Sequence, residues 1–296
     1  MLSVRLCYVS ILIVLALTWH VVLGQQSRPD SVAVTISTNG DSTSAVLQSD
    51  NPGSADSTAA IPSSLIADSV TLFRRIENQA FQVGEHLVFD VAYGIINAGK
   101  ATMSIPDTQT VSGRPCYHIL TTAASNKFFS TFHKVRDRAE TFIDIDGIFP
   151  WRFEKHIREG RYKADRSATF DQRNNLAIYR NDTTIVVPYV QGVLSSFYYI
   201  RTVPLEVGAA FDIDNFGDGK LYPLRILVHK RERVKVPAGT FDCIVVEPVL
   251  RSEGIFKSTG KITIWLTDDE RRIPVLMKTK VLIGSIDAKL KSYRLK

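Results

Sequence analysis

A stripe of cationic residues is the part of the sequence best suited to binding a ligand. Polar and apolar residues alternate along 135–145 and 151–158, which is typical of strands with two unlike faces. Side chains on one face of paired strands form a continuous patch, because neighbouring strands lie about 4.8 Å apart. Arginines in such a patch can hold anionic lipid headgroups or acidic glycans through bidentate contacts. The stripe consists of Lys134, Arg136, Arg138, Arg152, His156 and Arg158.

The same cationic stripe can also be the solvent side of an amphipathic sheet. Asp137, Glu140 and Glu154 lie between its cations in the sequence and would neutralise part of their charge. Charged residues are mostly exposed in folded proteins, whatever their role. We favour this second interpretation, and ligand binding by the stripe stays the alternative.

Residue types that can catalyse a reaction occur, but not in a recognisable arrangement. Three carboxylates at Asp268–Glu270 are followed at once by Arg271 and Arg272, which predicts a hairpin turn whose charges screen one another. Ser195 and Ser196 lack the Gly-x-Ser-x-Gly motif of one large class of hydrolases. We therefore expect a protein that is not an enzyme.

Metal and cofactor sites are not indicated by the sequence either. The stretch Asp212–Gly219 is expected to be an acidic turn region, and it places Phe216 where an EF-hand needs an oxygen ligand. The histidines are scattered, and none forms a pair at the spacing of a zinc site. Cys116 and Cys243 both lie in apolar, strand-like segments. Two alternatives follow: the residues form a disulfide, or both are buried free thiols.

The beginning of the chain has the features of an exported protein. An apolar run follows Arg5, and Val22 and Gly24 fit the −3 and −1 positions of a cleavage site. We predict a signal peptide at residues 1–24, with an uncleaved membrane anchor as the alternative. The expected location is the periplasm or the cell surface.

Composition divides the remainder of the chain into two parts. Residues 25–80 are rich in Ser, Thr and Asp and bury too little apolar surface to fold, so we predict a disordered tether. Residues 81–296 are expected to form a β domain. The net charge of the whole chain is +6, and the tether is acidic, so the β domain is basic and suits anionic partners. Nucleic acid is not expected, because no arginine-rich helix or RNA-binding motif occurs.

Consecutive hairpin patterns set the expected fold class. About thirteen alternating segments follow one another, separated by Gly, Asn and Asp turns. One segment, Gln191–Val203, has a 3.6-residue apolar repeat between Pro188 and Pro204 and is predicted to be helical. The prediction is a mainly β protein: a large antiparallel curved sheet or open β-barrel of meander hairpins, with one covering α-helix.

Four short motifs, taken in order, resemble a known family. They are Gly94 with Asn97-Ala98-Gly99, then Arg158-Glu159-Gly160-Arg161-Tyr162, the segment Val236–Cys243 and the segment Ile264–Val275. In this order they resemble the bacterial exported domain-of-unknown-function family 3108, over about Phe81 to Arg294. The resemblance implies an antiparallel β fold in a bacterial cell envelope, akin to the curved half-barrels of periplasmic lipoprotein carriers. It implies no established activity and no catalytic residues.

Three functional hypotheses follow from these patterns. We favour a non-enzymatic envelope protein whose curved sheet binds an amphipathic or lipid-like ligand, or an anionic envelope glycan. The second hypothesis is a hydrolase acting on envelope glycan or lipid, which would need converging carboxylates or a Ser/His pair in a cleft. The third is a scaffold module that pairs with an envelope protein through an exposed sheet edge.

Overall fold

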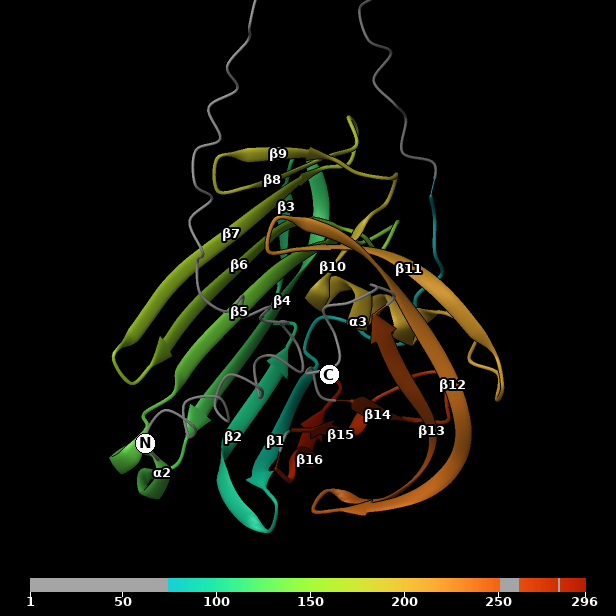
Figure 1. Cartoon of the computed structure of the whole chain (residues 1–296). Helices are drawn as coiled ribbons and strands as arrows, with labels where there is room; N and C mark the ends of the chain where they lie inside the picture. Colours follow the sequence, from blue (N-terminus) through green and yellow to red (C-terminus); the bar gives the residue numbers. More distant parts are fainter. Residues whose placement is uncertain (1–73, 251–260, 282) are drawn as a thin grey trace, which may run out of the picture. The chain divides into compact units, whose positions relative to one another are not determined.

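The structure is a computed structural model that describes residues 74–250, 261–281 and 283–296, all within one compact unit. Strands dominate this part of the chain (Figure 1). The strands are β1 (His86–Tyr93), β2 (Ile96–Ser104), β3 (Thr108–Val111), β4 (Arg114–Ser125), β5 (Arg136–Asp144), β6 (Pro150–Glu159), β7 (Tyr162–Asp171), β8 (Leu176–Tyr179), β9 (Asp182–Ile185), β10 (Gln191–Gly192), β11 (Ala210–Gly217), β12 (Lys220–Val236), β13 (Gly239–Leu250), β14 (Ile262–Thr267), β15 (Pro274–Lys280) and β16 (Ser285–Arg294). The helices are α2 (Lys127–Phe132) and α3 (Val193–Thr202).

All these strands belong to one sheet. Its order is β10-β11-β12-β13-β14-β15-β16-β1-β2-β4-β5-β6-β7-β8-β9, and β3 pairs with β4 beside this path. Most neighbours in the order are also neighbours in sequence, which is the pattern of a meander. The predicted mainly β class is confirmed, with one correction. The pair β10–β11 is parallel, so the sheet is not wholly antiparallel. The strands described do not close into a barrel, in agreement with the predicted open sheet.

The sheet has an inner face, against which α3 packs, and an outer face. Residues directly opposite each other in an antiparallel pair point to the same face. Phe89 pairs with Ala101, Ala101 with Ala123, and Ala123 with Asp137, so this row of side chains crosses four strands on one face. Phe89 is a core residue, which identifies the row as part of the inner face.

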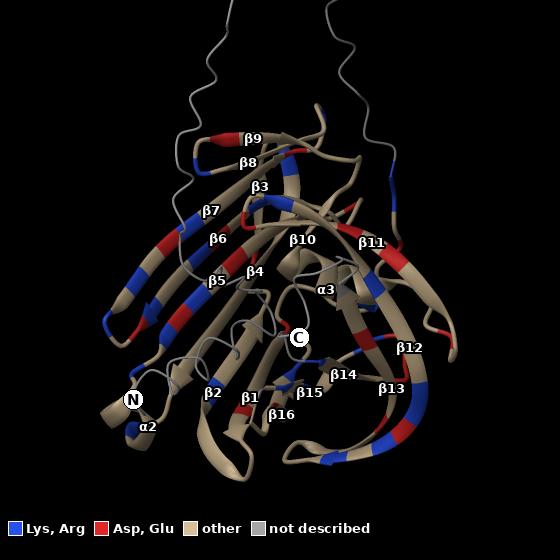
Figure 2. Ribbon diagram, in the orientation of Figure 1, with Lys and Arg blue, Asp and Glu red and all other residues tan. Residues whose placement is uncertain are grey.

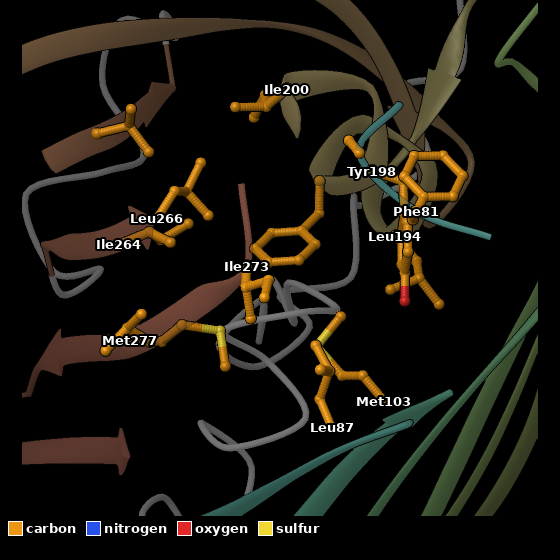
Figure 3. Close-up of a cluster of buried hydrophobic side chains, with 14 of the residues drawn as sticks. Phe81, Leu87, Met103, Leu194, Tyr198, Ile200, Ile264, Leu266, Ile273 and Met277 are labelled. Atoms are coloured by element: carbon orange, nitrogen blue, oxygen red, sulfur yellow. The ribbon is translucent and has the colours of Figure 1, made fainter. Parts of the chain in front are cut away.

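Helix α3 fills one part of the space in front of the inner face. The predicted helix over Gln191–Val203 is confirmed, with bounds that differ by one or two residues. Its side chains Leu194, Tyr198 and Ile200 are buried in the main apolar core. Figure 3 draws them in one cluster with Met103 and Met277. The same core also holds Ile213 of β11 and Ile143 of β5. Helix α3 contacts both of these strands, which lie far apart in the sheet order.

A buried ion pair fixes α3 to the first strand. Both nitrogens of the Arg201 guanidinium fork donate to Glu85, at 2.8 Å to Oε1 and 2.7 Å to Oε2. The same guanidinium donates to the carbonyl oxygens of Ala80, at 2.9 Å, and Arg271, at 3.1 Å. The Arg201 side chain is 0% exposed and the Glu85 side chain 2% exposed. Four bonds to one buried cation thus hold the helix in its place.

One predicted turn region is wrong. The stretch Asp212–Gly219 was expected to be a turn, but most of it lies in β11. Asp212 and Asp214 are exposed while Ile213 is buried, so the period of two continues through the acidic residues. Asp212 accepts two 2.8 Å bonds from Arg225 on the neighbouring strand. Cross-strand pairing thus overrides the turn preference of Asp here.

Several sequence predictions fall on residues that the structure does not describe. The signal peptide at 1–24 and most of the tether at 25–80 lie outside the described residues. Within 74–80, no helix or strand is present. Among the described helices, none is long and apolar enough to cross a membrane.

Candidate functional site

The predicted cationic stripe lies on the outer face of β5 and β6. Thr122 pairs with Arg138, and Arg138 pairs with His156, so these side chains share a face opposite to the row that contains Asp137. Figure 2 shows blue and red segments alternating along β5, β6 and β7. The structure brings Arg136, Arg138, Arg152, His156 and Arg158 onto this face, whereas Lys134 precedes β5.

Carboxylates neutralise most of this stripe. Arg138 lies 2.8 Å from Glu140, and Arg152 is paired with Glu154. His156 and Arg158 both contact Asp165, at 2.7 Å and 2.8 Å. These contacts agree with the solvent-side interpretation favoured above. Asp137 does not take part, because it points to the inner face, where the sequence had not placed it.

A second set of contacts extends the outer face toward β3 and β4. His118 lies between two carboxylates, with Nδ1 3.0 Å from Asp107 and Nε2 2.7 Å from Glu140. Ligand atoms of Glu140, Glu154 and His156 all lie within 4.8 Å of one another. Two carboxylates and an imidazole can hold a transition metal. Here both carboxylates are bound to arginines, which would have to be displaced first.

The inner face of β5 and β6 holds a different group of ionisable residues. We name Asp137, Lys155 and Glu159 the inner ionisable cluster; each is buried, with 2–3% exposure. Ala139 pairs with Lys155 on this face. Glu159 lies four residues after Lys155 in β6, so alternation places it on the same face. Asp137 Oδ1 accepts a 2.7 Å bond from the backbone nitrogen of Arg158. Lys155 Nζ lies 3.9 Å from Asp218 in the β11–β12 turn.

Burial and mutual repulsion shift the pKa values of the cluster. Burial, and then the nearby charge of Asp137, raise the pKa of Glu159 from 4.5 to about 8. Burial also raises the pKa of Asp137 and lowers that of Lys155. The two carboxyl groups interact, and the raised pKa keeps Glu159 mostly protonated at neutral pH. His133, whose Nε2 is buried without a hydrogen-bond partner, lies beside this pair.

Small side chains flank part of the inner ionisable cluster: Asp137 pairs with Ala123, and Lys155 pairs with Ala139. The strands that flank it carry alanine at positions where strands usually place larger residues. Five such positions lie on the inner face of four strands, and all five are buried: Ala101, Ala123, Ala139, Ala164 and Ala168. We name them the alanine floor. Two of these alanines also border larger apolar side chains, since Ala101 belongs to the main core and Ala168 to a second apolar cluster with Phe170 and Phe216.

The sequence profile of a protein family of unknown function, DUF3108, matches residues 88–291. The chain belongs to the DUF3108 family. This confirms the family to which the four motifs pointed. No curated protein matches the chain.

A comparison with solved structures finds matches to this DUF3108 domain at low sequence identity. A β-barrel-like protein of the DUF1849 family from Brucella abortus is 11% identical, with a TM-score of 0.46, over 73% of this chain and 99% of that chain. A protein of Parabacteroides distasonis with a provisional description as a lipoprotein is 10% identical, with a TM-score of 0.33, over 75% of this chain and 99% of the other.

Sequence reasoning missed the inner ionisable cluster of this DUF3108 domain. Asp137 and Glu159 stand within the charged segments, where their neighbours are the cations of the stripe. One signal was present in the alternation itself. Asp137, Ala139 and Thr141 share one face of β5, and Arg136, Arg138 and Glu140 share the other. A carboxylate on the apolar side of a strand is costly to bury, and such residues often belong to a site.

The structure has Cys116 and Cys243 as free thiols. Cys116 on β4 and Cys243 on β13 are both buried. They lie in separate apolar clusters. Burial raises the pKa of each thiol to about 12.

We therefore expect both thiols of the DUF3108 domain to be inert in the folded protein. At neutral pH the native protein should not react with a thiol reagent such as dithionitrobenzoate, because only the thiolate is nucleophilic. After unfolding without a reductant, Cys116 and Cys243 should both react. An unfolded sample that shows neither thiol would instead mean that the disulfide forms.

Proposed function

We propose that this protein is a non-enzymatic envelope protein that binds an amphipathic ligand on the inner face of its sheet. The observation that carries the proposal is the position of the inner ionisable cluster beside the alanine floor. Charged groups with shifted pKa values and a surface of small apolar side chains lie on the same face of neighbouring strands. The export of the protein to the cell envelope is part of this proposal.

The inner ionisable cluster suits the polar end of such a ligand. Asp137 and Glu159 offer carboxyl oxygens, and Lys155 offers an ammonium group, at one place on the face. A headgroup that carries hydroxyl or amino groups can donate to the carboxyl oxygens. An anionic glycan is the less suitable ligand, because the cations of the outer stripe are already paired with Glu140, Glu154 and Asp165.

The alanine floor suits the apolar end of the ligand. Methyl side chains present no polar atom to an acyl chain. Because these alanines are only 0–7% exposed, the acyl chain would have to displace the side chains that cover them. The part of the inner face beneath α3 is occupied by its own side chains, so the ligand is assigned to the other part.

A shallow groove elsewhere on the sheet is a weaker candidate. It has a volume of about 640 Å³ and lies near the turn after β5. Its lining includes Arg75, Glu77, Asn78 and Asp146. These side chains suit a small polar molecule better than an acyl chain.

Lipid extraction and native mass spectrometry test the proposal. Protein purified from its native host should carry a co-purifying amphipathic molecule, which denaturing extraction releases. Protein that carries none, and that takes up no fluorescent acyl probe in titration, would contradict ligand binding.

We expect Ala164→Trp to abolish uptake of the acyl probe. The indole would stand on the alanine floor, next to Ile157 on the paired strand, and would occupy the space assigned to the acyl chain. The matched control is Ser167→Trp, on the outer face of the same strand, where the side chain is exposed. Circular dichroism should show that both variants are folded. Equal probe uptake by a folded Ala164→Trp variant would exclude this part of the inner face.

A hydrolase remains the second proposal, because the structure does bring two carboxyl groups together. The pKa of Glu159, raised to about 8 by burial and by Asp137, suits a general acid, and Asp137 is the carboxyl group beside it. The partners of His156 are carboxylates, not a nucleophile of the serine or cysteine type. A panel of fluorogenic ester and glycoside substrates tests this second proposal. Turnover that Glu159→Gln removes would favour the hydrolase over the binding protein.

A further inference from the structure

One end of the sheet presents large apolar side chains to solvent. They lie in the β1–β2 turn, in α2, at the start of β7 and in the turn before β16. Strand pairing places these elements at the same end, because Gly99 pairs with Ser125 and Ile286 with Tyr93. The side chains are Ile95 (102% exposed), Ile96 (52%), Phe128 (64%), Phe132 (66%), Tyr162 (47%) and Ile283 (66%). We name this set the apolar end.

Hydrogen bonds link the four elements of the apolar end into one surface. The hydroxyl of Tyr93 donates to the carbonyl of Ile283 at 2.7 Å. The amide of Asn126, at the start of α2, donates to the carbonyl of Asn97 at 2.7 Å. The backbone nitrogen of Gly160 donates to the carbonyl of Lys134 at 2.8 Å, which joins the β6–β7 turn to the segment after α2. The exposed apolar residues therefore belong to neighbouring tips (Figure 1).

Helix α2 shows that the apolar end is not part of the core. The helix has six residues, three of which are phenylalanines, and none of its residues is buried. The rings of Phe128 and Phe132 contact each other, with 5.5 Å between their centroids. Exposed apolar residues that cluster in this way mark an interaction surface.

The turns that form the apolar end carry positive charges. They contain exposed cations and no acidic residue over 94–100, 126–134, 160–163 and 280–284. These cations are Lys100, Lys127, Lys134, Arg161, Lys163 and Lys280, and each is exposed. The turns at the opposite end of the same strands are different, since they carry Asp107, Asp146, Asp171 and Asp268–Glu270. Figure 2 shows no red segment at the β1–β2 tip or on α2.

We propose that the apolar end docks this protein on an anionic lipid bilayer. Aromatic and aliphatic side chains at several tips can enter the boundary between headgroups and acyl chains, while the surrounding cations contact the anionic headgroups. The bilayer is favoured over a protein partner because the turns that carry the apolar side chains hold six exposed cations and no carboxylate, which complements a surface of uniform negative charge. Docking of the apolar end on a bilayer does not require that a ligand bind to the inner face.

Co-sedimentation with vesicles tests the inference. The purified protein should bind vesicles of phosphatidylcholine mixed with phosphatidylglycerol, and added salt should weaken this binding. Binding to phosphatidylcholine alone should be much weaker. The double variant Phe128→Ser/Phe132→Ser should lower the affinity for the mixed vesicles by about tenfold or more, because burial of two rings is lost. Lys127→Glu/Lys134→Glu should lower it by about fivefold per residue, and only for anionic vesicles.

Two control variants separate docking from a general change in the protein. Ile185→Ser removes another exposed isoleucine, on β9, which lies at the opposite end. Lys220→Glu removes an exposed cation in the β11–β12 turn. Both controls should bind mixed vesicles as the unchanged protein does. The inference is overturned if neither vesicle type is bound, if the phenylalanine variant binds as before, or if Ile185→Ser loses as much affinity. Equal binding to both vesicle types would overturn the preference for anionic lipid.

Discussion

Replacing Glu85 with alanine should lower the free energy of unfolding by about 3–5 kcal/mol. The substitution leaves the Arg201 guanidinium, which is 0% exposed, without its carboxylate partner. The remaining bonds to the carbonyls of Ala80 and Arg271 do not neutralise its charge. Urea unfolding followed by tryptophan fluorescence measures the loss. Because Arg201 is in α3, we also expect the helix to lose contact with the first strand.

The control for this prediction is an exposed pair of the same geometry. Arg225 donates two 2.8 Å bonds to Asp212, but both side chains are about two-fifths exposed. Asp212→Ala should therefore cost less than about 1 kcal/mol. The double variant Glu85→Met/Arg201→Met should be more stable than Glu85→Ala, because it leaves no buried charge. Equal losses for Glu85→Ala and Asp212→Ala would show that the buried pair is not what fixes α3.

The elements of this fold could be predicted where local pattern and tertiary packing agree. The helix near Gln191–Val203 and the meander of hairpins follow from periodicity and turn residues, and both are present. The acidic stretch Asp212–Gly219 was misjudged, since its composition favours a turn while the pairing partner Arg225 favours a strand. The parallel pair β10–β11 could not be predicted, because it depends on how α3 returns the chain to the sheet.

The family motif at Gly94 to Gly99 could be recognised from the sequence, but its structural role could not. The Asn97-Ala98-Gly99 segment, part of one of the four motifs, lies within β2. In the structure a β-carbon on Gly99 would lie 2.1 Å from the carbonyl oxygen of Ala124, so only glycine allows β2 to approach β4 this closely. Asn97 also accepts the bond from Asn126 that positions α2. The motif therefore has a role in building the apolar end.

The candidate sites also depend partly on local pattern and partly on tertiary contacts. Alternation was enough to place Arg138, Arg152 and His156 on one face, and the structure agrees. It was not enough to show which carboxylates meet across strands, because that depends on the register of β5 with β6. The approach of Asp137 to Glu159 and of Lys155 to Asp218 joins residues 22 and 63 positions apart, respectively. Such contacts appear only when the sheet is assembled.

The stability of the protein should fall as the pH rises from about 4.5 to about 8. The pKa of Glu159 is 4.5 in its ordinary state and about 8 in the folded protein, mainly because the side chain is buried. Between these values the folded state binds a proton that the unfolded state has released, so the free energy of unfolding decreases with pH. The pKa of Asp137 is raised as well, which gives a contribution of the same sign starting from lower pH. The combined loss should be on the order of a few kcal/mol.

The variant Glu159→Gln should flatten this pH dependence, because the amide does not titrate. Burial lowers the pKa of Lys155 below its ordinary value of 10.5, so this residue makes stability rise with pH as the pH approaches 10.5. Urea midpoints are therefore best compared at about pH 5 and about pH 8, across the range in which Glu159 titrates. The matched control is Glu154→Gln, the same substitution on the outer face of the same strand. It should keep the slope of the unchanged protein. If Glu159→Gln keeps that slope too, Glu159 is ionised throughout this range and the two carboxyl groups do not share a proton.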